Sequence, residues 1–113
     1  MAVKAYCNDP LLLLNKIKAG IRSGSIQTWT LDKDGDFSHS PMQWMNKGWF
    51  RPVIGQGVLL FNILGPTQAV MSKETYGVYH GRFIEMLLTH FDTDCSSATA
   101  TALPVSGDIL GGP

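Results

Sequence analysis

The segment Trp49–Leu64, WFRPVIGQGVLLFNIL, is the part of the chain from which the fold can be predicted. Residues 58–64 form the most apolar run of the sequence, interrupted only by Asn62, as is typical of a strand in the middle of a sheet. Gly55-Gln56-Gly57 is a compact turn, and Trp49–Ile54 before it reads as a strand. We therefore expect two central strands that pair antiparallel.

A helix and a strand are predicted upstream of this segment. Asp9 and Pro10 suit a helix start, because a short polar side chain accepts hydrogen bonds from free backbone N–H groups and proline tolerates the first helical position. The helix is expected from about Asp9 to Arg22, with apolar residues recurring at helical spacing: Leu13 or Leu14, Ile17 and Ile21. After Ser23-Gly24, the run Ile26–Leu31 is predicted to be a strand.

The motif Asp32–Asp36, DKDGD, allows two interpretations. Its alternating carboxylates resemble the first half of an EF-hand calcium loop, but position six is Phe37 instead of glycine and position twelve is Gln43 instead of glutamate. Asp-Gly between two strand-like runs is a hairpin turn signal, so we favour a turn over a calcium site, with Phe37–Ser40 as the returning strand.

A long second helix is predicted downstream, from its cap at Ser72 to about Asp92. Its expected apolar stripe consists of Phe83, Ile84, Leu87, Leu88 and Phe91. Gly77 and Gly81 lie one turn apart, and each lowers helix stability by about 1 kcal/mol relative to alanine. Close packing on the sheet is the explanation we favour for these glycines, and close approach of a ligand or partner backbone is the alternative.

The C-terminal part contains one more predicted strand and a tail. Cys95–Leu103 alternates small residues with threonine and is expected at a sheet edge, whereas 105–113 is rich in glycine and is predicted to be a flexible tail. Residues 1–104 are therefore expected to form a single α+β domain. We predict a two-layer sandwich with an antiparallel sheet of three to five strands and both helices on one face.

Composition narrows the range of functions. The chain has 113 residues, with nine basic and nine acidic side chains, so its formal net charge is zero. This balance argues against a broad surface for nucleic acid or membrane lipid. No apolar run is long enough for a signal peptide or a membrane span, so we expect a cytoplasmic protein without a membrane partner. Cys7 and Cys95 lack metal-ligand spacing and are expected as reduced thiols, and we predict no cofactor.

The segment Asp36–Pro52, DFSHSPMQWMNKGWFRP, contains the candidate binding residues. Trp44, Trp49, Arg51 and Lys47 combine aromatic planes and cations, which are enriched in binding hot spots. The competing interpretation is that both tryptophans belong to the core. Our first hypothesis is a small binding or regulatory protein that acts through contact with a protein partner or with a second copy of itself.

Catalysis is the second hypothesis. His80 and Tyr76 are i, i+4 neighbours on the predicted helix, so they point the same way, and Arg82 could hold a phosphate. With His39 as a further candidate, this set suggests a metal-independent, ribonuclease-like phosphodiesterase. The opposing interpretation is that the rings of Tyr76, Tyr79 and His80 lie at the core boundary. A third hypothesis is a small-ligand pocket lined by the side chains of Trp44, Trp49, Tyr76 and Tyr79. No metal site is predicted, because too few ligand residues occur together.

Overall fold

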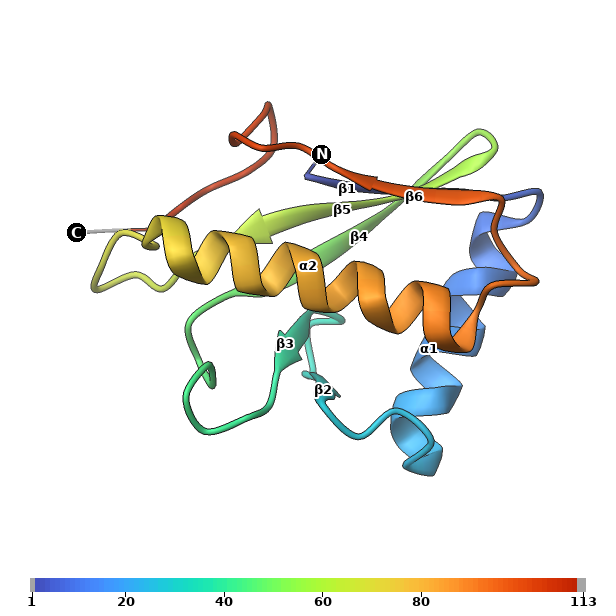
Figure 1. The fold of residues 1–113 in the computed structure, drawn as a ribbon, viewed down its shortest axis with the longest axis horizontal. Helices are drawn as coiled ribbons and strands as arrows, with labels where there is room; N and C mark the ends of the chain where they lie inside the picture. The colour runs from blue at the N-terminus through green and yellow to red at the C-terminus, as the bar shows by residue number, and fades with distance from the viewer. Residues whose placement is uncertain (1, 112–113) are drawn as a thin grey trace.

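The structure is a computed structural model that describes residues 2–111. Its elements follow one another as β1 (Val3–Tyr6), α1 (Pro10–Ser23), β2 (Trp29–Leu31), β3 (Phe37–His39), β4 (Trp49–Gly55), β5 (Val58–Leu64), α2 (Lys73–His90) and β6 (Ser97–Ala100). The strands form one antiparallel sheet in the order β2-β3-β4-β5-β1-β6 (Figure 1). The predicted α+β class is confirmed.

The predicted number of strands is too low, because the sheet of the described residues has six strands where three to five were expected. The strand that sequence analysis did not assign is β1, which lies between β5 and β6. Its four residues, VKAY, are too few to produce a clear alternating pattern. Its position in the sheet depends on pairing with segments more than fifty residues away in the chain, such as Val3 with Phe61.

The central hairpin is confirmed as predicted. β4 and β5 pair from Trp49 with Leu64 to Gly55 with Val58. Gly57 in the turn has a φ of 71°, a backbone conformation that glycine adopts without steric penalty. Residues alternate along both strands, so that Phe50, Leu59, Phe61 and Ile63 are fully buried on one face and Trp49, Arg51 and Leu64 lie on the other.

Both helices begin at the predicted caps. The side chain of Asp9 accepts a hydrogen bond from Leu12 N at 3.1 Å, and that of Ser72 accepts one from Thr75 N at 3.1 Å. The DKDGD motif also forms the predicted hairpin turn, in which Asp32 Oδ1 accepts hydrogen bonds from the backbone N–H groups of Asp34 and Asp36. Short-range polar signals were therefore read correctly.

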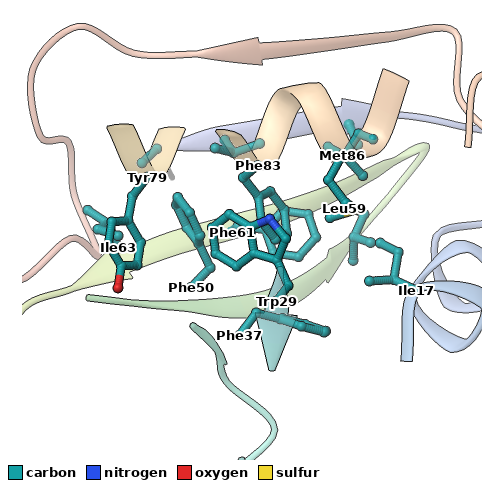
Figure 2. Close-up of a cluster of buried hydrophobic side chains, with 14 of the residues drawn as sticks. Ile17, Trp29, Phe37, Phe50, Leu59, Phe61, Ile63, Tyr79, Phe83 and Met86 are labelled. Carbon is teal, nitrogen blue, oxygen red and sulfur yellow. The ribbon is translucent and has the colours of Figure 1, made fainter. Parts of the chain in front are cut away.

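One core holds the two helices to the sheet. Figure 2 shows Phe83 of α2 among aromatic rings from the strands, with ring centres 4.6 Å from Phe61, 4.7 Å from Phe50 and 4.9 Å from Trp29. Ile17 of α1 belongs to the same cluster. Such edge-to-face and tilted contacts stabilise the fold beyond what the burial of their apolar area provides.

The predicted contact face of α2 is only partly correct. Phe83, Leu87 and Phe91 are buried, but Leu88 is 54% exposed. The buried face also extends into the N-terminal half of the helix, where it includes the rings of Tyr76, Tyr79 and His80. The packing explanation for the glycines is wrong: apart from the neighbouring residues and the backbone of α2 itself, no atom of the described residues lies within 4 Å of a Cβ placed at Gly77 or Gly81.

The segment after β6 returns to the sheet. Ile109 N donates to Ile63 O at 3.0 Å, and Gly65 N donates to Ile109 O at 2.7 Å, so this segment runs beside β5 beyond the end of β1. Asp108 Oδ1 accepts a further hydrogen bond from Ile63 N. These contacts belong to the segment that sequence analysis assigned to a flexible tail. Its flexibility stays a prediction, and residues 112 and 113 lie outside the described residues.

Candidate functional site

The loop of residues 40–48 connects β3 to β4 and is built from two successive turns. Trp44 N donates to Pro41 O at 2.8 Å, and Lys47 N donates to Trp44 O at 3.3 Å. Asn46 has a φ of 60°, which is uncommon for a residue other than glycine. Figure 1 shows this loop projecting from the body of the molecule on the side away from α1.

This loop is anchored to the core at its middle and at its end. The Tyr79 hydroxyl donates to Trp44 O at 2.5 Å, and the Ser38 hydroxyl donates to Gly48 O at 2.8 Å. Gly48 is buried so closely that a Cβ there would lie 2.8 Å from Met71 Cε and 3.2 Å from the Tyr79 ring. The loop is therefore held at Trp44 and Gly48 by packing and by hydrogen bonds.

The turns of the loop expose apolar side chains. Met42 is 88% exposed and Met45 is 47% exposed. Sequence analysis did not select these methionines, because exposure cannot be read from residue type. The available signal was their position between Pro41, which follows the end of β3, and the next strand.

The three tryptophans occupy different environments. Trp29, which sequence analysis assigned only to a strand, is the one in the core, at 2% exposed. Trp44 is half-buried against the core, with Lys47 Nζ 5.9 Å from its ring centre, a cation–π geometry. Trp49 is also half-buried and lies on the sheet face opposite to Phe50. Neither candidate tryptophan is fully buried.

A shallow groove of about 480 Å³ runs beside Trp49. Its lining includes the apolar side chains of Leu64 and Pro66 and carboxylates from the β2–β3 turn. The lining residues are Asp32, Asp34, Asp36, Asn46, Trp49, Leu64, Gly65, Pro66, Thr67 and Gln68. The groove therefore combines one aromatic side chain with carboxylates.

Arg51 does not supply a free cation to this surface. Its Nε and Nη2 donate to Asp36 Oδ1 and Oδ2 at 2.9 and 2.8 Å, a bidentate pair with a buried carboxylate. The hydrogen bonds to Asp36 raise the pKa of the Arg51 guanidinium above its ordinary value. The pair joins β4 to the β2–β3 turn, so its first role is structural.

His80 and Tyr76 are brought together, but inside the molecule. Their rings stack with centres 3.8 Å apart, His80 is 4% exposed, and its Nδ1 lies 2.6 Å from Tyr76 O. Burial lowers the pKa of His80, and no hydrogen-bond partner for its Nε2 lies among the described residues. The Tyr76 hydroxyl donates to Thr101 O at 3.0 Å.

The other catalytic candidates lie apart from this pair. Arg82 is on the exposed side of α2, where its guanidinium is 3.4 Å from the Glu85 carboxylate. His39 is 4% exposed, its Nδ1 is 2.8 Å from Thr28 O, and its ring centre is 4.5 Å from that of Trp29. Burial lowers the pKa of His39 as well. The four candidates thus do not meet on one surface.

The residues of the proposed ligand pocket are also divided between two sides of the sheet. Tyr76 and Tyr79 lie on the buried face of α2, whereas Trp49 lies on the opposite sheet face. Within residues 2–111, no three His, Cys, Asp or Glu side chains are grouped so that they could hold a metal ion. In the described part of the chain, no helix has the length and apolar character needed to cross a membrane.

Comparison with known proteins adds no relative. No family model matches the sequence, and neither the curated proteins nor the solved structures yield a match.

Proposed function

We propose that this protein acts by binding a protein partner through the loop of residues 40–48 and the groove beside Trp49, together called the loop–groove surface. The observation that carries this proposal is Met42, which is 88% exposed in a loop that is anchored to the core at Trp44 and Gly48. An apolar side chain exposed to water in this way does not contribute to the core. Loops positioned by a rigid scaffold are common sites of binding.

The chemistry of the surface supports the same proposal. Methionine side chains are flexible and polarisable, so they adapt to varied apolar partners. Trp49 offers a large aromatic area beside the carboxylates of the groove, and Lys47 adds a cation at the loop. The surface is therefore aromatic and carries both acidic and basic side chains. Arg51 adds no free cation to it, because its guanidinium is paired with Asp36.

Site-specific photo-crosslinking tests this proposal. A benzophenone amino acid placed at Met42 is expected to crosslink one protein in a lysate of the producing cells. The same group at Leu11, which lies in α1 and is 56% exposed, is the matched control and is expected to yield no such product. Equal crosslinking from both positions would contradict the proposal.

The Trp49→Ala variant provides the second measurement. We expect it to weaken binding of the captured partner while the circular dichroism spectrum stays that of the folded chain, because Trp49 lies outside the main core. Unfolding of this variant would show that Trp49 is needed for the fold, and would remove the support that the groove provides.

The catalytic alternative receives less support. A general acid or base must reach the proton that it transfers, whereas His80 is buried under Tyr76 and Arg82 is paired with Glu85 on the exposed side of α2. An assay for phosphodiesterase activity tests it: the alternative requires that the unmodified chain is active and that His80→Ala is not.

A further inference from the structure

β6 is an open edge of the sheet. Cys7 N donates to Gly57 O, so the backbone N–H and C=O groups of alternate residues of β1 point toward β5. Those of the residues between them point toward β6. Thr101 N accordingly donates to Ala2 O at 2.9 Å, and Thr99 pairs with Lys4. The backbone N–H and C=O groups of Ala98 and Ala100 therefore point away from β1. Among the described residues, no hydrogen bond to them is formed on that side.

β6 has only four residues, but this edge lacks the charged side chains and prolines that usually prevent strands from pairing between molecules. Natural edge strands are commonly kept short or carry lysine, proline or a bulge. Residues 96–103, SSATATAL, contain no charged residue, and the first proline follows at position 104. At the opposite edge, β2 has three residues and is followed by the charged turn DKDGD. Figure 1 shows β6 along the outer side of the sheet, with no element beyond it.

The open edge of β6 is complementary to itself. Ala98 and Ala100 lie symmetrically about Thr99, so the same strand in the reverse direction offers an acceptor for each donor and a donor for each acceptor. The side chains in this register are small, and no like charges would lie opposite each other. A two-fold axis at Thr99 would also place two threonines opposite each other, a pair that stabilises antiparallel strands.

We propose that two copies of this chain associate through β6, which pairs antiparallel with β6 of the second copy about a two-fold axis at Thr99. Ala98 of one copy then exchanges backbone hydrogen bonds with Ala100 of the other, and the two sheets become continuous. The loop–groove surface lies at β3 and β4, away from this edge in the strand order, so both of its copies stay accessible. The dimer presents two binding surfaces, which strengthens attachment to a partner with two matching sites.

Charge exchange at Thr99 tests the proposal. Thr99 is exposed on the outer sheet face, so neither Thr99→Lys nor Thr99→Glu removes a core contact. Each variant alone would place like charges opposite each other across the axis, and its dimer dissociation constant should rise about tenfold. An equimolar mixture of the two should form a heterodimer, because opposite charges then face each other. Sedimentation velocity over a range of concentrations measures these species.

The control uses the other edge of the sheet. Thr30 is an exposed threonine in β2, and Thr30→Lys should associate like the unmodified chain. Lys4 lies opposite Thr99 within one copy, so it would repel the lysine of Thr99→Lys. If that variant fails to fold, Thr99→Glu alone decides the result. A chain that sediments as a monomer at its highest soluble concentration would overturn the proposal. A dimer that the Thr99 substitutions leave unchanged would also overturn it.

Discussion

His80 illustrates how the environment decides the role of a single residue. In the sequence it stands beside Tyr76 on a helix and has the chemistry of a general acid or base. In the structure its ring is enclosed by Tyr76 and Phe50, with ring centres at 3.8 and 5.1 Å. Burial favours the neutral imidazole, which packs here as an aromatic side chain.

The buried histidines make the stability of the protein depend on pH. Burial lowers the pKa of His80 and of His39 below the ordinary value, so below about pH 6.5 the unfolded chain binds more protons than the folded one. The free energy of unfolding should therefore decrease as pH falls through this value. The expected slope is at most ~1.4 kcal/mol per pH unit for each histidine.

Urea denaturation between about pH 7 and pH 5 measures this slope. His80→Asn should reduce it, and His90→Asn, at an exposed position of the same helix, is the matched control. A free energy of unfolding that stays constant over this range would contradict the prediction, as would a His80→Asn variant that retains the full slope.

At the scale of the element, α2 contains two glycines that no close contact among the described residues requires. Sequence analysis expected Gly77 and Gly81 to pack against the sheet, but they face open space among the described residues. The angle of a residue around the helix axis follows from its number. Which side of the helix is buried depends on the elements that pack against it. Here the rings of Tyr76, Tyr79 and Phe83 determine that direction.

Gly77→Ala and Gly81→Ala should each raise the free energy of unfolding by about 0.5–1 kcal/mol, because alanine has the higher helix propensity and the added methyl group meets no atom. Thermal and urea unfolding measure the change. Gly48→Ala is the contrasting variant and should be destabilising, because its Cβ would lie 2.8 Å from Met71 Cε. A loss of stability in both helix variants would show that these glycines are needed in the folded chain.

At the scale of the whole molecule, the C-terminal segment connects regions that are distant in sequence. Leu110 O accepts a hydrogen bond from Met71 N at 2.9 Å, while Asp108 and Ile109 bond to Ile63 in β5. Gly65 allows this approach, since a Cβ there would lie 2.0 Å from Leu110 O. Composition alone suggested a tail, because glycine and proline cannot indicate which backbone they approach.

Removal of residues 105–113 should lower the free energy of unfolding by roughly 2–4 kcal/mol, because four hydrogen bonds to the β5 region and Met71 are lost at about 1 kcal/mol each, three between backbone groups and one to the Asp108 side chain. Gly65→Ala should destabilise the full chain by about 1–3 kcal/mol through overpacking against Leu110, but leave the shortened chain nearly unaffected. A double-mutant cycle by urea denaturation measures this coupling. Equal effects of Gly65→Ala in both chains would contradict a docked segment.

The candidate site could be predicted in part from the sequence. Trp44, Lys47 and Trp49 were selected by residue type, neither tryptophan is fully buried, and their role in binding stays a prediction. The pairing of Arg51 with Asp36 was not predicted, because the two meet only when β4 lies beside the β2–β3 turn. The exposure of Met42 likewise depends on the path of the loop.

The sequence by itself determined the local elements: the hairpin of β4 and β5, the turn at DKDGD, and the helix caps at Asp9 and Ser72. These depend on interactions over a few residues, so spacing and side-chain chemistry suffice to predict them. Only the tertiary structure decided that β1 lies between β5 and β6, that Trp29 is core while Trp49 lines a groove, and that β6 forms an open edge. Those outcomes depend on contacts between segments far apart in the chain, and no short pattern in the sequence encodes them.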